Sequence, residues 1–263
     1  MRLVLLLWLA SACTTPSPPG RAASHRTLGH AHNDYDHARP LLEALDAGFR
    51  SVEVDIYYAG GTLAVSHDGG RSEGTLEALY LAPLQRRIDS HHGTVDGDGQ
   101  PFRLVIDLKD RRDELPAAID AVFSRYPMLS RFVGDTYVRG PVEVVFTGDE
   151  AMKRAMVART PWGTRDTNVF STADPVTDAR WTEYALPWST SIDWNGDGTI
   201  PADEQRTLQY LVGYAHALHR TIRFYGAPDR PLVWAAEAAA GVDFISTDDL
   251  AGLARFLGSR AGR

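Results

Sequence analysis

Short β-prone apolar runs alternate with helical patterns along nearly the whole chain, and this alternation limits the possible folds most. A strand followed by a helix and a further strand gives parallel pairing within one sheet. About eight strand candidates follow one another from Thr27 onward. In order they are Thr27–His30, Ser51–Tyr57, Arg103–Leu108, Val142–Thr147, Thr167–Ser171, Leu186–Ile192, Thr221–Tyr225 and Val242–Thr247. A closed TIM barrel requires eight strand–helix units, so we predict the α/β class and a single (β/α)8 TIM barrel.

Helical patterns, with apolar residues three and four positions apart, fill several of the segments between these strands. They cover Ala38–Ala47, Leu115–Arg125, Ala202–Leu218 and Pro231–Ala239. After the second strand, Gly60-Gly61 leads into the alternating segment Thr62–Ser66, which predicts a hairpin in place of a helical crossover. Barrel closure depends on the fifth strand candidate, whose pattern is the weakest of the set.

The size and charge of the chain narrow its function. Its 263 residues match a barrel, which commonly takes about 250 residues as one domain. The net charge is −7, from 34 Asp and Glu against 27 Lys and Arg, which argues against nucleic-acid binding because that function normally uses a basic face. The single cysteine excludes an internal disulfide and a thiolate metal cluster.

The first residues have the pattern of an export signal. The apolar run Leu3–Ala10 is too short for a bilayer span of about 20 residues but is typical of a signal peptide. Small residues lead into Cys13, and a Pro/Ser-rich stretch follows it, which resembles a bacterial lipoprotein leader with Ala10 in place of the usual leucine. We expect a signal peptide with lipobox over 1–13, a flexible linker over 14–26 and the barrel over 27–263. The protein would be an exported cell-envelope lipoprotein, held by a lipid anchor rather than a transmembrane helix, or a secreted protein.

Acidic residues gather at the ends of the predicted strands. Side chains two apart on a strand share a face, which pairs Glu53 with Asp55 and Asp107 with Lys109. Burying three carboxylates together is costly unless a cation neutralises them. An all-oxygen set of Glu53, Asp55 and Asp107 suits one divalent cation, Mg²⁺ or Ca²⁺. The alternative is an ion-pair network with Lys109 and an arginine.

Two histidines, His30 and His67, also end strand candidates. Histidine exchanges protons near neutral pH, so one imidazole could deprotonate an attacking hydroxyl or water while the other protonates a leaving alkoxide. Lys109 and the cation would stabilise charge on phosphoryl oxygens. His32 stays undecided, because a loop after the strand could redirect its side chain. The other histidines have no evident role beyond structure: His25, His37, His91, His92, His216 and His219.

These runs together resemble the superfamily of phosphatidylinositol-specific phospholipase C and glycerophosphodiester phosphodiesterase. The resemblance is carried by Gly29–Asp34, Arg39–Leu42, Ala47–Phe49, Ser51–Asp55, His67-Asp68, Val105–Lys109, Arg223–Pro228 and Gly241–Asp249. Within the superfamily, the His-Asn-Asp-Tyr form is similar to the group that contains altered inheritance of mitochondria protein 6. The resemblance implies a TIM barrel with His30 as base, His67 as acid, Lys109 on the phosphate and Glu53, Asp55 and Asp107 on one metal. The glycerophosphodiesterases have His-Arg-Gly where this chain has His30-Ala31-His32.

The function that follows is a metal-dependent phosphodiester hydrolase acting on a small phosphodiester or a lipid head group, and we expect a monomer. A different class is also possible, because His30-Ala31-His32 could be the His-x-His of an amidohydrolase-type zinc hydrolase. That class needs histidines on later strands, and none occurs between His92 and His216. A non-catalytic ligand-binding barrel with a structural metal is the third alternative.

A second metal candidate lies in the segment 193–204. Oxygen ligands stand at loop positions 1, 3, 5 and 12, which are Asp193, Asn195, Asp197 and Glu204, with glycine at position 6. This spacing is that of an EF-hand calcium loop, and a helical pattern follows it. No helical pattern precedes it, so the other interpretation is a polar loop at the barrel mouth with Trp194 touching substrate.

Overall fold

Eight parallel strands close into a barrel in the computed structural model, which describes residues 27–175 and 178–261. The strands are β1 (Leu28–Ala31), β2 (Ser51–Ala59), β5 (Phe102–Leu108), β8 (Val142–Gly148), β9 (Thr164–Thr167), β10 (Trp181–Pro187), β11 (Thr221–Tyr225) and β12 (Phe244–Thr247). Pairing of β1 with both β12 and β2 closes the ring. The predicted single (β/α)8 barrel is therefore confirmed. The segments 1–13 and 14–26, with Cys13 and His25, lie outside the described residues.

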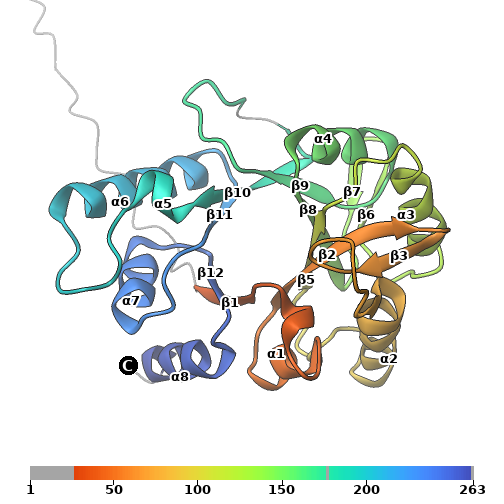
Figure 1. Cartoon of the computed structure of the whole chain (residues 1–263), viewed down its shortest axis with the longest axis horizontal. Coiled ribbons are helices and arrows are strands. Elements are labelled where there is room, and N and C mark those ends of the chain that lie inside the picture. Colours follow the sequence, from red (N-terminus) through yellow and green to blue (C-terminus); the bar gives the residue numbers. More distant parts are fainter. Residues whose placement is uncertain (1–26, 176–177, 262–263) are drawn as a thin grey trace, which may run out of the picture.

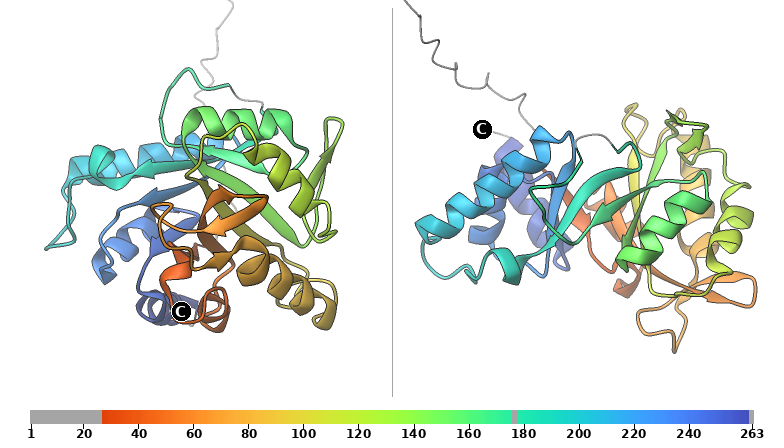
Figure 2. Two further views of the ribbon diagram at one scale, coloured as in Figure 1. Left: turned by 45° about the vertical axis from the view of Figure 1, so that its right-hand side comes forward. Right: turned by 90° about the horizontal axis from the view of Figure 1, so that it is seen from above.

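Helices surround the strands on the outside, as Figures 1 and 2 show. They are η1 (Asp34–Asp36), α1 (Leu42–Asp46), η2 (Glu77–Leu81), α2 (Ala82–Ser90), α3 (Leu115–Phe123), α4 (Glu150–Arg159), α5 (Trp188–Ser191), α6 (Ala202–Ala217), α7 (Pro231–Ala240) and α8 (Leu250–Ala261). Local chemistry sets their ends: Asp149 caps α4 by accepting the backbone N–H groups of Ala151 and Met152, and Gly241 ends α7 with φ 89°. None of the described helices is long and apolar enough to cross a bilayer.

The core has an apolar and a charged part. Between strands and helices, the buried side chains are mostly Val, Leu, Ile and aromatic residues. Inside the barrel, Glu53, Asp166, Glu183 and Arg223 are buried as well, and Arg223 makes ion pairs with all three acids. Buried charges require such partners because unpaired charges are strongly disfavoured away from water. The barrel interior is therefore polar where the site lies.

Two small additions decorate the barrel. β3 (Thr62–Val65) pairs antiparallel with β2, and β4 (Gly74–Thr75) extends it, so the hairpin expected after Gly60-Gly61 is present. Between α3 and β8, β6 (Arg131–Val133) and β7 (Thr136–Val138) form a separate two-stranded sheet.

The fifth and sixth strands differ from their predicted positions. β9 covers Thr164–Thr167 rather than Thr167–Ser171, because its polar sequence Thr-Arg-Asp-Thr is buried through ion pairs and not through an apolar face. β10 covers Trp181–Pro187 rather than Leu186–Ile192, since the chain turns into α5 after Pro187. No helix joins β9 to β10 among the described residues of that connection.

Several helices also differ from prediction. The helix expected over Ala38–Ala47 forms only as Leu42–Asp46, because Leu41 has φ 65° and breaks the helical path. The sequence patterns missed α2, α4 and α8. Of these three helices, α4 contributes to the site, because its Lys153 bonds Asn168 at the barrel mouth.

Candidate active site

Three carboxylates converge on two neighbouring strands, from the first part of β2 and from the end of β5. Asp55 is the register partner of Asp107, and Glu53 lies two residues earlier on the same face of β2. One oxygen of each carboxylate lies within 4.8 Å of the others. Glu53 and Asp55 are buried, and Asp107 nearly so. The clustering expected from the spacing is therefore present.

Two cations face this cluster. Lys109 Nζ lies 2.8 Å from Asp107 Oδ2 and 3.2 Å from Asp55 Oδ2, and Arg223 Nη1 lies 3.2 Å from Glu53 Oε2. Burial raises the pKa of Asp107 to about 6, and the negative charge of Glu53 adds to this. Burial alone would lower the pKa of Lys109, but its bonds to Asp107 and Asp55 raise that pKa to about 12. The ion-pair network considered as an alternative thus exists around the same acids.

The donor set nevertheless fits a divalent cation. Asp55 Oδ1 and Asp107 Oδ1 are buried and accept no hydrogen bond from any described residue. A buried carboxylate oxygen without a partner costs free energy, which a hard cation would offset. Glu53, Asp55 and Asp107 offer only oxygen ligands, as Mg²⁺ and Ca²⁺ prefer.

The two predicted catalytic histidines occupy different environments. His30 is fully buried, with Nδ1 2.7 Å from Ser51 Oγ and Nε2 3.0 Å from Glu53 Oε2. Its burial lowers its pKa to about 4, so the ring is neutral at pH 7. His67 has a 67% exposed side chain and hydrogen-bonds Asp55 Oδ2 through Nδ1 at 2.9 Å, which leaves Nε2 without a bond to the described residues. His67 can therefore exchange a proton with solvent or substrate as it stands.

A polar cavity of about 270 Å³ opens at this end of the barrel. Its wall includes His32, the residue after β1, whose Nδ1 lies 2.9 Å from Asp248 Oδ1. His30 does not line the cavity. The full set of lining residues is His32, Asn33, Glu53, His67, Asp107, Lys109, Thr147, Gly148, Asn168, Arg223 and Tyr225.

The loop after β1 supplies a contact that the spacing did not predict. The Tyr35 hydroxyl donates to Asp55 Oδ2 at 2.9 Å. The Tyr35 hydroxyl oxygen also lies 3.4 Å from His67 Nδ1. Buried Asp34 holds the loop by accepting the Leu41 backbone N–H and the Tyr80 hydroxyl. The His-Asn-Asp-Tyr run was visible in the sequence, but these partners are not adjacent in it.

A second missed contact comes from α4. Lys153 is fully buried, and its Nζ donates to Asp166 Oδ1 at 2.7 Å, to Asn168 Oδ1 at 2.8 Å and to Glu150 Oε1 at 3.0 Å. Because an ammonium group only donates, the Asn168 side-chain oxygen is its acceptor, and the Asn168 amide NH₂ donates to the carbonyl oxygen of Gly148 at 3.3 Å. Lys153 therefore fixes the orientation of Asn168, which lines the cavity together with Gly148.

The residues of the candidate calcium loop are not gathered into a second cluster. Glu204 Oε2 accepts the backbone N–H groups of Asp193 and Trp194, and Arg230 pairs with Asp197 Oδ1. Asn195 donates to Asp197 Oδ2 at 2.9 Å. Within the described part of the chain, the Glu53, Asp55 and Asp107 group is the one set of three potential ligands that converges.

The fold is an eight-stranded TIM barrel with three acids and a lysine gathered at its mouth. The chain belongs to the AIM6-like phosphodiesterase domain family, whose model matches residues 25–166. Two of the curated proteins that are similar to this chain are called altered inheritance of mitochondria protein 6. The Eremothecium gossypii protein is 28% identical over 95% of this chain and 76% of its own, and the Kluyveromyces lactis protein is 24% identical over 86% and 71%.

Solved structures share the fold. A glycerophosphodiester phosphodiesterase from Parabacteroides distasonis has a TM-score of 0.60 and 15% identity, covering 91% of this chain and 100% of its own. A calcium-dependent phosphoinositol-specific phospholipase C from a Pseudomonas species has a TM-score of 0.58 and 15% identity, covering 87% and 92%. An Oleispira antarctica phosphodiesterase in complex with its product sn-glycerol-3-phosphate has a TM-score of 0.51 and 14% identity, covering 88% and 96%.

Proposed function

We propose that this protein hydrolyses phosphodiesters at the carboxyl-terminal mouth of the barrel. The observation that carries the proposal is the convergence of Glu53, Asp55 and Asp107 beside Lys109 in a cavity that His67 also lines. Cationic groups beside a small cavity suit the negative charge of a phosphodiester. Membership of a phosphodiesterase family and the shared fold of known diesterases support the same reaction class.

We propose further that Glu53, Asp55 and Asp107 hold one divalent cation, Mg²⁺ or Ca²⁺. The orphaned oxygens of Asp55 and Asp107 support this. When bound, such a cation neutralises charge on phosphoryl oxygens. The calcium-dependent phospholipase with the same fold makes Ca²⁺ one of the two ions to test.

The chain's own residues divide the remaining work. His67 is the proton donor to the leaving oxygen, with Asp55 holding its Nδ1 and so fixing Nε2 as the reactive nitrogen. Lys109 and Arg223 bind phosphoryl oxygens from the cavity wall. His30 is the base in this proposal, which requires Glu53 to release His30 Nε2, since both ring nitrogens are hydrogen-bonded in the structure.

The substrate we propose is a small phosphodiester or the exposed head group of a lipid. A cavity of about 270 Å³ is just below the usual range of small-molecule sites, about 300–1,000 Å³, so the cavity itself takes a compact group. The product complex of the Oleispira antarctica phosphodiesterase gives glycerol phosphodiesters priority in the test.

The decisive experiment is a panel of glycerol, choline and inositol phosphodiesters assayed with Mg²⁺, with Ca²⁺ and with EDTA. We expect turnover that EDTA abolishes, and loss of both turnover and metal affinity in Glu53→Gln and Asp55→Asn. A cyclic phosphate detected by ³¹P NMR would identify a substrate hydroxyl as nucleophile, and a monoester alone would identify water. Turnover of amides or esters with zinc would favour the amidohydrolase alternative, and metal binding without any turnover would favour a binding barrel.

We also propose that Cys13 is lipidated and holds the protein at a membrane. The proposal rests on the sequence alone: one cysteine, preceded by small residues and followed by a Pro/Ser stretch. In a bacterial host, Cys13→Ser should move the protein to the soluble envelope fraction. Equal membrane association of both forms would count against the anchor.

A further inference from the structure

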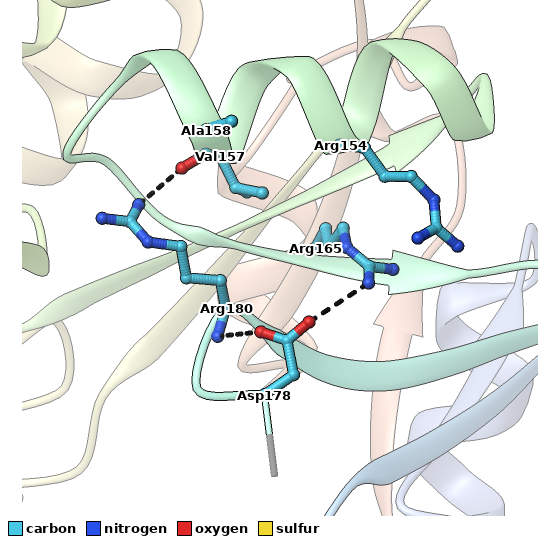
Figure 3. A pocket seen from close by; sticks show the side chains of 6 residues that line it. All are labelled: Arg154, Val157, Ala158, Arg165, Asp178 and Arg180. Atoms are coloured by element: carbon cyan, nitrogen blue, oxygen red, sulfur yellow. Dashed lines mark hydrogen bonds and ion pairs between the residues drawn. The ribbon is translucent and has the colours of Figure 1, made fainter. Parts of the chain in front are cut away.

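A second polar cavity lies on the outer wall of the barrel, apart from the mouth. It has a volume of about 350 Å³ and is lined by Arg154, Val157, Ala158, Arg165, Asp178 and Arg180. Figure 3 shows its three arginines reaching this hollow from α4, from β9 and from the residue before β10. The volume is within the range of small-molecule sites. A helix would ordinarily cover this part of a barrel, but none joins β9 to β10 among the residues that the structure describes there.

The charges around this cavity do not balance. Three arginines face two carboxylates, Asp178 in the lining and Glu150 beside Arg154, which leaves an excess of one positive charge. The chain as a whole carries −7, so the surplus is local and opposite in sign to the rest of the protein. An uncompensated cluster of guanidinium groups attracts anions.

Arg165 is the buried member of the cluster. Its side chain is 4% exposed, and the one carboxylate that it meets among the described residues outside the barrel is Asp178, at 3.3 Å. Burial lowers the pKa of Arg165, and the positive charge of Arg154 adds to this lowering. A buried cation with one long ion pair would gain from a further anionic partner.

Arg180, unlike Arg165, has no carboxylate partner among the described residues. Its Nη1 donates to the carbonyl oxygens of Val157 and Thr160, at 2.7 and 3.1 Å, and no described carboxylate makes an ion pair with it. Arg154 is 62% exposed and meets only Glu150, at 3.8 Å through Nε. Both side chains therefore keep N–H groups available for a ligand.

The cavity is separate from the catalytic mouth. Successive residues on a strand point to opposite faces, so Arg165 faces outward toward α4 while its neighbour Asp166 faces the interior and pairs with Arg223. No residue lines both cavities. A ligand here would not enter the proposed active site.

We propose that this arginine pocket, formed by Arg154, Arg165 and Arg180, is a binding site for a dianionic phosphate group, as inorganic phosphate or a small phosphomonoester. A phosphate group offers an oxygen to each of the three arginines, whereas a monocarboxylate offers only two oxygens. The planar donor fork of arginine fits phosphate oxygens in pairs. The proposal does not rest on the proposed catalytic function, since phosphate could bind here whether or not the mouth cleaves diesters.

Calorimetric titration of the full chain with inorganic phosphate tests the proposal. We expect saturable binding with a Kd of about 1 mM or tighter, which weakens as ionic strength rises. Arg154→Gln should weaken binding by about tenfold or more, because it removes a charge-assisted hydrogen bond from an exposed residue whose loss should not unfold the protein. Arg154→Lys keeps the positive charge but loses the planar pair of donors, so its phosphate affinity should lie between those of the wild type and Arg154→Gln.

Two controls locate the bound phosphate. Arg139 is also exposed and pairs with a glutamate four residues away, Glu143 at 3.5 Å, so Arg139→Gln should leave phosphate affinity unchanged. Lys109→Gln, at the mouth, should also leave this binding in place. Absence of saturable heat, equal affinity in Arg154→Gln and the wild type, or loss of binding in Lys109→Gln alone would overturn the proposal. Acetate binding as tightly as phosphate would overturn its claim on a dianion.

Discussion

Two walls of the barrel are built on opposite principles. The first wall, β2, β5 and β8, is paired over its whole length: six consecutive residues of β2 pair with β5, and seven of β5 with β8. The second wall, β9 and β10, is paired loosely at β9, although β10 pairs with β11 over five consecutive residues. Only two residues of β9 pair with β8, and the three pairs between β9 and β10 include a bulge at Trp181 and Glu183.

The side chains of the two walls differ in the same way. The first wall buries Val, Ile and Leu outward and places its acids near the strand ends. The second wall buries Asp166 and Glu183, which are held by Lys153 and by Arg103 and Arg223. A buried ion pair adds little net stability but is costly to break from one side. The first wall therefore carries the proposed chemistry on a stable frame, while the second depends on each of its partners.

Loss of the His67 imidazole, which bonds Asp55 of the first wall, should remove turnover without unfolding the protein. His67→Ala should lower kcat by about 10²- to 10⁴-fold, the usual contribution of a placed proton donor. Its side chain is exposed, so the melting temperature should stay close to that of the wild type. Diester cleavage and thermal unfolding measured on the same preparations check this.

The control for this variant is His91→Ala, which changes a histidine outside the mouth and should retain full activity. If His30→Ala is also inactive, the double variant should lose far less than the product of the two single losses, since residues that act as a unit are not additive. Full activity in His67→Ala would remove the chemistry from the first wall.

At the second wall, Lys153→Met should mainly lower stability. The substitution removes the ammonium group that pairs with fully buried Asp166 and also bonds Asn168. Breaking a buried ion pair from one side costs about 3–5 kcal/mol. Urea denaturation measures the free energy of unfolding. Arg159→Gln, which breaks an exposed pair with Asp113 at 3.4 Å, is the control and should cost no more than about 0.5 kcal/mol. Equal effects of the two variants would contradict the contrast between the walls.

The same contrast explains how far the sequence could be interpreted. The apolar runs of β2, β5 and β8 are enough to locate these strands. The i, i+2 spacing predicts that Glu53 and Asp55 share a face, and they do converge with Asp107. β9 was misplaced because Thr-Arg-Asp-Thr has no apolar residue, and its burial depends on charges supplied from α4 and β11. No local pattern contains those partners.

The site could be predicted only where neighbours in sequence make it. Tyr35, Asn168 and Arg223 reach the mouth because the closed barrel brings the ends of β1, β9 and β11 together. His32 follows the last residue of β1, and its place in the cavity wall depends on the path of the loop after β1, which no local pattern specifies. The acid and base roles of His30 and His67 stay predictions.

A smaller loss of stability is expected from a substitution at Gly148, the last residue of β8 in the first wall. Gly148 ends β8 with φ 99°, and a Cβ there would lie 2.2 Å from Asp107 Oδ1. Gly148→Ala should therefore cost backbone strain plus about 1–3 kcal/mol of overpacking, and should weaken metal binding through Asp107. Gly134→Ala, with φ 60° and open space around its Cβ, should cost only the strain. Similar losses of unfolding free energy in both variants would mean that Asp107 moves aside for the new Cβ at little cost.

A pH-dependent effect is expected at a buried acid that, unlike those of the second wall, has no hydrogen-bond partner among the described residues. Glu237 on α7 is fully buried, and neither carboxylate oxygen meets a hydrogen-bond donor among the described residues. Burial raises its pKa well above the ordinary value of 4.5, and the negative charge of Asp229 adds to this. A raised pKa in the folded state means that its contribution to stability is fully present below 4.5 and is lost as the pH rises toward the folded value.

Glu237→Gln removes that titration while keeping the size of the side chain. The free energy of unfolding of the wild type should fall relative to the variant by up to about 1.4 kcal/mol per pH unit above 4.5, until the folded pKa is reached. Urea denaturation of both proteins between pH 4.5 and 7.5 measures the difference. Curves that stay parallel over this range would mean that Glu237 finds a partner or water in solution. The cost of a buried charge in this barrel would then not depend on a fixed partner, and the contrast between the two walls would lose its physical basis.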